Sequence, residues 1–347
     1  MLVLGLETSC DETAVALVED GARVRSNVIG SQAEHHRPYG GVVPEIAARA
    51  HLELLLPVID RAFVESGCTY GDVDAIAVTT GPGLVGALLV GVAAGKALAL
   101  ARDVPFIGVN HLEGHVCAVQ LEFGPLEPPL VGLVVSGGHT SLVHLDRDGR
   151  FATLGATIDD AAGEAFDKIA RFIGLPYPGG PEIDRLAVEG DPAAIALPRA
   201  LLHDGTYDFS LSGLKTAVVR ELRRREATGE DIDIADVAAS FQEAVVDVQV
   251  AKTVRAAVEH DVEHVTVVGG VAANTRLRER MTAACAAEGL RLLVPAPALC
   301  TDNGAMIAAA GWNRLTAGQT TPLDVSADPN LPLERMPLWR AGDGGGP

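Results

Sequence analysis

The chain has 347 residues, of which 48% are hydrophobic and 21% charged. This composition indicates a packed globular protein with room for two domains, and it excludes a disordered or fibrous chain. The formal net charge of −19 argues against a generally basic surface for nucleic acid, so phosphate contacts would need a local basic strip or a partner protein. Two arginine-rich runs, at 220–225 and 276–280, are more typical of solvated helix faces.

The first half of the chain alternates strands and helices. Residues 2–20 predict two strands around a polar turn at 8–13, and a polar, glycine-rich loop follows at 31–41. A proline near its start and apolar residues at helical spacing predict a helix over 44–63. The pattern then predicts a strand at 75–79, a turn at 81–83, a helix at 84–101, a strand at 105–109 and a helix from His111.

The second half opens in the same way. Residues 130–145 again predict a strand, a polar turn and a strand, and an offset of 127 residues aligns Glu12 with His139. Two such hairpins, followed by alternating strands and helices, predict an internally duplicated α/β fold. The later helices are expected at 160–172, 181–189, 214–226, 234–259, from 274 and at 303–315, and the later strands at 264–268 and 291–294. The Pro/Gly-rich tail after Pro322 is expected to wrap the surface or to stay disordered.

Several features bear on the compartment. Five cysteines, an odd number without a CxxC pair, favour a reducing compartment over a disulfide framework or a zinc ribbon. No basic segment precedes the first strand, so we expect no signal peptide. The apolar stretch 84–101 contains Lys96 and several glycines, which favours a buried helix over a membrane span. We therefore expect a cytoplasmic protein with no membrane partner.

The sharpest chemical signal is the motif His111-Leu-Glu-Gly-His115. Two histidines at i and i+4 share one helix face, at the spacing that brings two imidazole nitrogens to one metal ion. The alternative is a pair of ordinary core or surface histidines. Asp302, just before the last predicted helix, is the candidate third ligand unless it only caps that helix. Two histidines and a carboxylate suit iron(II) or catalytic zinc(II), whereas Leu112 stands where a HExxH metalloprotease has its glutamate.

Two polar turns are candidates for binding phosphate. The segment 136–140, SGGHT, lies between two strands, where backbone amides at the glycines can approach an oxyanion; the alternative is an ordinary β-turn. Its counterpart at 8–13 contains Asp11 and Glu12, which could orient a nucleophile or accept a proton, or could simply form and cap the turn.

Further polar residues follow glycine-rich loops in the second half. Asn274 follows a strand and the pair Gly269-Gly270, a crossover that holds nucleotides in many α/β proteins, although Asn274 could equally be a simple N-cap. The loop YPGGPEID ends in Asp184, which could hold ribose hydroxyls. Asp167 lies on a predicted helix, where a solvent-facing role is the ordinary expectation.

Ten motifs occur in order along the chain: ETSCDET, GGVVPEIAARAH, GPGLVGAL, NHLEGH, SGGHT, AGEAFDK, YPGGPEIDRLA, FSLSGLKTA, GGVAANTRLR and CTDNGAMIA. Together, over about residues 1–325, they resemble the universal tRNA N6-threonylcarbamoyladenosine (t6A) transferase family, formerly called O-sialoglycoprotein endopeptidases. The two hairpins and the duplicated fold also resemble the actin–hexokinase–Hsp70 superfamily. The resemblance implies lobes over 1–112 and 113–302 with the ligand site in the cleft between them, a helix at 303–322 packing back on the first lobe, and a tail over 323–347.

The resemblance also implies roles for individual residues. The metal ligands would be His111, His115 and Asp302, with Fe(2+) as the expected ion and Zn(2+) as the alternative. The phosphate region of the substrate would contact Val135, Ser136, Gly137, Gly138 and His139, and the remaining ligand contacts would be Asp167, Gly180, Asp184 and Asn274. Asp11 matches an acidic residue near the reaction centre, and Glu12 beside it is the second catalytic candidate.

The implied reaction moves a threonylcarbamoyl group from threonylcarbamoyl-AMP to N6 of adenosine 37 in tRNAs that read codons beginning with A. In bacterial members a non-catalytic paralogue pairs with this subunit, and a small ATPase joins the pair. Two alternatives remain: an ATP-dependent small-molecule kinase on the same fold, which gives no reason for HLEGH, and a non-catalytic scaffold, which should have lost the metal and phosphate motifs.

Overall fold

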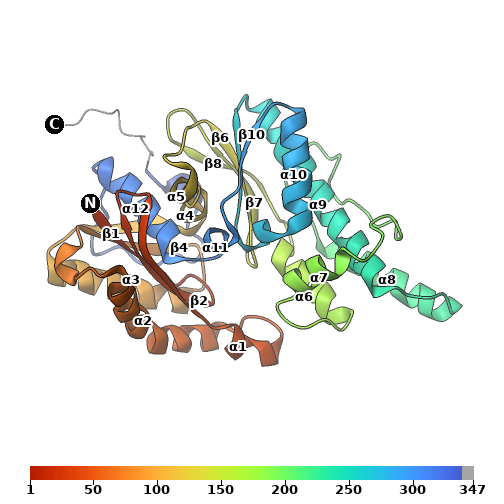
Figure 1. The fold of residues 1–347 in the computed structure, drawn as a ribbon, viewed down its shortest axis with the longest axis horizontal. Coiled ribbons are helices and arrows are strands. Elements are labelled where there is room, and N and C mark those ends of the chain that lie inside the picture. The colour runs from red at the N-terminus through yellow and green to blue at the C-terminus, as the bar shows by residue number, and fades with distance from the viewer. Residues whose placement is uncertain (338–347) are drawn as a thin grey trace. The chain divides into compact units, whose positions relative to one another are not determined.

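The structure, a computed structural model, describes residues 1–337. The chain forms two compact units, coloured by residue number in Figure 1. Unit 1 contains residues 1–128, 145–152 and the chain from 298 onward, and unit 2 contains 129–144 and 153–297. These units divide the chain differently from the predicted boundaries, because the segments 113–128, 145–152 and 298–302 belong to unit 1.

Unit 1 is built on a five-stranded sheet of order β3-β2-β1-β4-β5. β1 pairs antiparallel with β2 and parallel with β4, and β4 pairs parallel with β5. β1, β4 and β5 are buried along their whole length, as expected for near-continuous apolar runs covered on both faces. The strands are β1 (Leu2–Glu7), β2 (Glu12–Glu19), β3 (Arg23–Ser31), β4 (Ala75–Gly81) and β5 (Phe106–Asn110).

Helices cover both faces of this sheet (Figure 1). α2 and α3 pack against β2, β3 and β4, while α12 packs against β1, β2, β4 and β5 and also against α4. Alternation along β1 explains the two faces: Leu4 and Leu6 join the core with α2 and α3, whereas Gly5 faces α12. The helices are α1 (Ala33–His36), α2 (Pro44–Ser66), α3 (Val85–Arg102), α4 (His111–Cys117), α5 (Gln120–Phe123), α11 (Pro297–Cys300), α12 (Gly304–Thr316) and the 3-10 turns η1 (Arg37–Tyr39), η2 (Tyr70–Asp72) and η4 (Leu333–Arg335).

Unit 2 repeats the sheet of unit 1. Its strand order is β10-β9-β6-β7-β8, so in each sheet the first strand is central, the second and third lie on one side and the fourth and fifth on the other. This shared order confirms the predicted duplication. The elements are β6 (Leu130–Val135), β7 (Thr140–Leu145), β8 (Phe151–Ala156), α6 (Ala162–Phe172), α7 (Gly179–Ala187), α8 (Ser212–Thr228), α9 (Ile234–Glu259), β9 (His264–Val268), η3 (Gly270–Ala273), α10 (Thr275–Ala287) and β10 (Arg291–Leu293).

α3 is the predicted apolar helix, and within residues 1–337 only this helix is long and apolar enough to cross a membrane. Its glycines pack closely on the sheet, Gly91 against Thr8 and Gly95 against Val78. The opposite side of the helix is open: Leu89 is 52% exposed and Leu100 is 72% exposed. The expected small-residue face is therefore present, whereas the expected burial holds for only one side of the helix.

The described part of the C-terminal segment wraps unit 1. Thr321 exchanges hydrogen bonds with the backbone of β5, and the backbone N–H of Asp328 donates to the Thr80 carbonyl oxygen of β4. Further along, the Asn110 side chain donates to the Leu331 carbonyl oxygen at 3.0 Å. The tail predicted over 323–347 thus follows the unit 1 surface as far as residue 337, and its remaining residues lie outside those that the structure describes.

Candidate functional site

The two histidines of the HLEGH motif lie at the start of α4, directly after β5. The side chain of Asn110 accepts a hydrogen bond from the Leu112 N–H and caps the helix, so that His111 is its first residue. His115 follows one turn later, and the two imidazole rings meet edge to face with centroids 4.6 Å apart. Both side chains are buried. The local sequence therefore brings two imidazoles to one point of unit 1.

Asp302 completes this cluster from the other end of the chain. Its Oδ1 lies 3.1 Å from His115 Nε2 and 3.7 Å from His111 Nε2. The helix cap considered for Asp302 is made instead by its neighbour Asn303, which accepts from the Met306 N–H. One potential ligand atom from each of His111, His115 and Asp302 lies within 4.8 Å of the others.

The donor set suits a cation. Separations of 3.1 and 3.7 Å fall in the range of about 3–4 Å expected when ligand atoms share one ion at 2.0–2.2 Å. His115 Nδ1 is buried and has no hydrogen-bond partner among the described residues, and its buried Nε2 lies 3.1 Å from Asp302 Oδ1. Burial disfavours a charged imidazolium at His111, but the carboxylates of Glu7 and Asp302 outweigh burial and raise the pKa of His111 to about 9. The cluster is thus arranged to hold positive charge.

The polar turn between β1 and β2 places Asp11 and Glu12 in unit 1 with this cluster. Burial, followed by the charge of Asp302, raises the pKa of Asp11. Burial also raises the pKa of Glu12 to about 7, against the effect of a 2.9 Å hydrogen bond from Ser31 Oγ to its Oε1. The other oxygen, Oε2, is buried and has no partner among residues 1–337. Glu12 therefore keeps one carboxylate oxygen, Oε2, free to accept a proton, and its pKa lies near neutral pH.

A buried network that the sequence did not reveal holds this turn. His51 Nε2 lies 3.0 Å from the Cys10 carbonyl oxygen, and its Nδ1 lies 2.7 Å from Thr13 Oγ1. Because a carbonyl only accepts, Nε2 carries the proton and Nδ1 accepts from the Thr13 hydroxyl. Gln32 adds a 3.4 Å contact from its amide to Thr13. The available signal was His51 at the end of GGVVPEIAARAH, but its distance in sequence from the turn gave no reason to join them.

The SGGH turn connects β6 and β7 in unit 2. It closes through Ser136 N–H donating to the His139 carbonyl oxygen at 2.8 Å and His139 N–H donating to Ser136 Oγ at 3.1 Å. A Cβ at Gly137 or Gly138 would meet nothing within 4 Å, so the backbone there faces open space. Val135 is fully buried in the sheet and can offer a ligand only its backbone. The turn is therefore open at its glycines, as a phosphate-binding loop requires.

Three other residues of unit 2 predicted to contact the ligand are connected through α7: Gly180 and Asp184 lie on this helix, and Asp167 is hydrogen-bonded to its first residue. Asp167 Oδ1 accepts from the Gly179 N–H at 2.7 Å, which corrects the expectation of a merely solvent-facing side chain. Gly180 follows directly and has no atom within 4 Å of a Cβ position. Asp184 accepts from both the N–H and the hydroxyl of Thr275.

Asn274 makes the N-cap of α10. Its side-chain oxygen accepts from the Leu277 N–H at 2.9 Å, and its amide donates to Gln242 at 2.7 Å. The capping alternative considered from the sequence is therefore present. Asn274 is followed directly by Thr275, whose bonds to Asp184 join the start of α10 to α7. These residues together form one edge of unit 2.

Neither arginine run forms a free basic strip along its whole length. Arg224 and Arg225 bind Glu221, Arg276 and Arg280 bind Glu243, and Arg278 donates to backbone carbonyl oxygens.

The glutamate of the HLEGH motif is engaged in an ion pair, because Glu113 is fully buried and accepts from Arg314 at 2.6 Å. A HExxH metalloprotease mechanism therefore finds Leu112 at its glutamate position and no free carboxylate at the neighbouring Glu113.

The duplicated five-stranded sheet places the chain in the actin-like class of α/β proteins. HypF from T. kodakarensis has the same fold over 91% of this chain and 48% of its own, with a TM-score of 0.62 at 16% identity. The (R)-2-hydroxyglutaryl-CoA dehydratase component A of Acidaminococcus fermentans matches 90% of this chain and 98% of its own, with a TM-score of 0.53 at 13% identity. At these identities the likeness extends to the fold alone.

Sequence comparison is more specific. A family model described as tRNA N6-adenosine threonylcarbamoyltransferase (TsaD) matches residues 23–309. The protein of that name from Symbiobacterium thermophilum is 57% identical over 96% of this chain and 97% of its own, and the one from Geobacillus thermodenitrificans is 54% identical over 95% and 96%. The chain belongs to the tRNA N6-adenosine threonylcarbamoyltransferase family, and this confirms the resemblance drawn from its motifs.

Proposed function

We propose that this chain transfers the threonylcarbamoyl group of threonylcarbamoyl-AMP to N6 of adenosine 37 in tRNAs reading codons that begin with A. The observation that carries the proposal is the cluster of His111, His115 and Asp302 in a chain of this family. In the reaction a C–N bond forms between N6 and the carbamoyl carbon, the bond from that carbon to the phosphate oxygen breaks, and AMP leaves. The amine proton passes to a base.

The cluster would hold one divalent ion, iron(II) first and zinc(II) second. Two imidazoles and a carboxylate with open positions suit both ions. When bound, the ion would supply Lewis acidity to the carbonyl and a positive anchor for the threonine carboxylate. The burial of both histidines and the short distances from their Nε2 atoms to Asp302 Oδ1 support this assignment.

The chain's own groups would supply positioning and proton transfer. The open amides at Gly137 and Gly138 would bind the phosphate of the leaving group. The edge of unit 2 formed by Gly180, Asp184 and Asn274 would bind the adenosine. Glu12 would accept the N6 proton, since its free, buried Oε2 and its pKa of about 7 suit a general base at neutral pH. The neighbouring Asp11 would help to set the pKa of Glu12, because its charge raises that pKa.

The test is formation of t6A on unmodified tRNA, measured by mass spectrometry of the digested nucleosides. The reaction contains L-threonine, bicarbonate, ATP, the adenylate-forming enzyme and the bacterial partner subunits. We expect product that requires this chain and is lost with His111→Ala. His35→Ala, at an exposed histidine of α1, is the matched control and should retain activity. A complete reaction without product, in the presence of folded protein, would contradict the proposal.

The same reaction separates the two alternatives. A small-molecule kinase would consume ATP with an acceptor other than tRNA and would not need His111. A scaffold would leave t6A formation unaffected when His111 is replaced. Product lost only in the His111 variant therefore excludes both.

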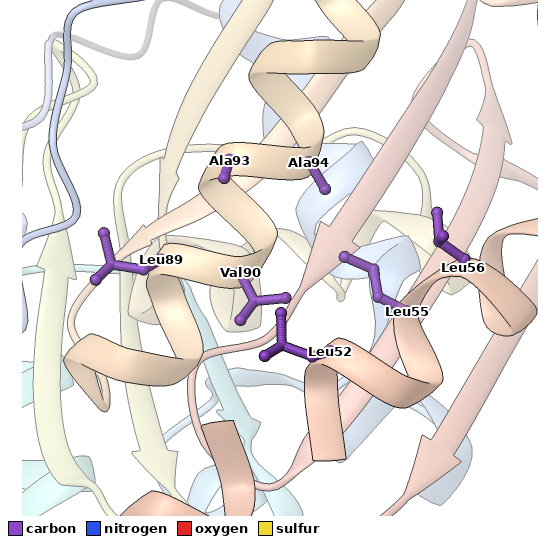
Figure 2. A pocket seen from close by; sticks show the side chains of 7 residues that line it. All are labelled: Leu52, Leu55, Leu56, Leu89, Val90, Ala93 and Ala94. Atoms are coloured by element: carbon purple, nitrogen blue, oxygen red, sulfur yellow. The ribbon is translucent and has the colours of Figure 1, made fainter. Parts of the chain in front are cut away.

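A heterodimer with the family's non-catalytic paralogue has a suitable surface in unit 1. An apolar groove of about 430 Å³ lies between α2 and α3. Figure 2 shows the side chains that line it. Leu52 and Leu56 are each 68% exposed and Leu89 is 52% exposed. A contiguous patch of exposed leucines is unusual on a monomeric globular protein. The groove is lined by Leu52, Leu55, Leu56, Leu89, Val90, Ala93 and Ala94, with no charged side chain among them.

We expect Leu56→Glu to weaken binding of the paralogue at least tenfold, because it places a charge at the centre of an apolar interface. Val188→Glu, at an 80% exposed valine of unit 2, is the matched control and should bind normally. Calorimetric titration of each variant with the paralogue measures the difference. Equal affinities would exclude the groove as the docking site.

The small ATPase would join the pair formed by this chain and the paralogue. The five free cysteines support a cytoplasmic location for the assembly.

A further inference from the structure

Glu7 is a buried carboxylate behind the proposed metal ligands. It is the last residue of β1, is fully buried and lies outside the roles assigned above. Its Oε1 accepts from the Ser9 N–H at 2.5 Å, and its Oε2 accepts from Thr79 Oγ1 at 2.6 Å. The same Oε2 lies 3.0 Å from His111 Nδ1. A buried charge with this many partners is held in one position.

The contact with Glu7 fixes which nitrogen of His111 carries its proton. Glu7 accepts at both of its oxygens, from the Ser9 N–H and from Thr79 Oγ1, as an ionised carboxylate does. A carboxylate only accepts, so Nδ1 must donate to it. The lone pair of a neutral His111 then lies on Nε2, the nitrogen that faces Asp302 at 3.7 Å.

We propose that Glu7 is a positioning residue for the metal site, which fixes the ring orientation and tautomer of His111 through Nδ1. The inference rests on the proposed metal function. Histidines that bind metals in proteins commonly donate their other ring N–H to a carboxylate, which also makes the imidazole a better ligand. Glu7 lies on β1, Thr79 lies on β4 and His111 directly follows β5, so three adjacent strands hold this arrangement.

Ser9 offers a competing partner, since its Oγ lies 3.2 Å from the same Nδ1. The Ser9 backbone already binds Glu7, and a hydroxyl can serve as either donor or acceptor, so it does not select a tautomer by itself. His115 provides an internal contrast, because its Nδ1 has no hydrogen-bond partner among residues 1–337. Support from a carboxylate is thus confined to one of the two histidines.

The experiment measures metal affinity rather than turnover. Full-length wild type and Glu7→Gln are stripped of metal, checked for folding by circular dichroism, and titrated with Zn(2+) against a chromophoric chelator. Gln is isosteric but is a weaker acceptor, so we expect the affinity to fall about 10–100-fold. The visible spectrum of the Co(2+)-loaded protein should change as well, because the His111 ring is less constrained. Glu53→Gln, an exposed glutamate of α2, controls for the lost charge and should match wild type.

The outcomes separate the two proposals. Wild type that binds no Zn(2+) or Co(2+) overturns the metal site and this inference together. Wild type that binds while folded Glu7→Gln retains its affinity and spectrum overturns the inference alone. If Glu7→Gln does not fold, Thr79→Val decides, because it removes one hydrogen bond from Oε2 and should lower the affinity severalfold. Unchanged affinity in Thr79→Val would then refute the role of Glu7.

Discussion

At the start of α4 and of α12, one of two neighbouring polar residues caps the helix and the other is a candidate metal ligand. Asn303 caps α12, which allows the preceding Asp302 to face the histidines. Asn110 caps α4, which allows the following His111 to project toward Asp302. A sequence shows that such pairs contain one cap and one ligand candidate, but it does not show which residue takes which role. The choice depends on backbone geometry at the helix end.

At the same scale, the pKa of Glu12 predicts how the rate depends on pH. If Glu12 accepts the N6 proton, the active form is the carboxylate, so the rate should rise with pH to an inflection near 7 and then level off. Burial is the largest cause of the raised pKa and the charges of Asp11 and Asp302 add to it. Single-turnover rates from pH 5.5 to 8.5 measure the profile, and Glu12→Gln should abolish the inflection.

Ser31 supplies the control for this prediction. Its hydroxyl stabilises the Glu12 carboxylate, so Ser31→Ala should move the inflection to higher pH while leaving the plateau rate nearly unchanged. An inflection that stays in place in both variants would assign the titration to another group.

At the scale of elements, the approach of α12 to β1 depends on glycine. A Cβ at Gly5 would lie 2.2 Å from the Gly304 carbonyl oxygen and 2.6 Å from the Ala308 nitrogen, so both contacts are with backbone that cannot easily move. We expect Gly5→Ala to reduce the free energy of unfolding by at least about 1–3 kcal/mol, the usual cost of overpacking. Chemical denaturation measures it. Gly138→Ala, where the space is open, should leave stability unchanged; equal effects would refute the argument.

The buried ion pair between Glu113 and Arg314 joins α4, which carries the histidines, to α12, which follows Asp302. Both side chains are almost completely buried. Glu113→Gln leaves a buried guanidinium without its counter-charge, so we expect a loss of about 3–5 kcal/mol in unfolding free energy. The double variant Glu113→Gln/Arg314→Met should recover much of that loss. Strict additivity of the two single changes in denaturation would contradict direct coupling.

Local patterns predicted most elements but not every strand. Continuous apolar runs indicated β1, β4, β6 and β9, and helix α9 begins and ends where its pattern does. β3 and β8 were missed because their charged and small residues alternate with apolar ones, as on edge strands. The predicted boundary at 112/113 differs from the unit division, because α4 packs against α12 from the far end of the chain.

At the scale of the whole molecule, charge predicts how the chain meets tRNA. The net charge is −19, and most arginines of the two runs are paired with glutamates or bound to carbonyl oxygens. We expect the isolated chain to bind tRNA weakly, with a shallow dependence of log K on log salt, and the complete assembly to bind more tightly with a steeper slope. Filter binding between 50 and 200 mM salt, about the range over which such contacts weaken, measures both. Tight, steeply salt-dependent binding by the chain alone would contradict this.

Unit 1 is assembled from both ends of the chain, with nearly all of unit 2 between them. Glu7, His111 and His115 are therefore translated long before Asp302 and α12. A ribosome that stops early releases a sheet whose α12 face is uncovered and whose histidines lack their carboxylate partner. Such a fragment exposes apolar strands to proteases and cannot complete the cluster, so the order of synthesis reserves the finished site for chains that are translated beyond α12.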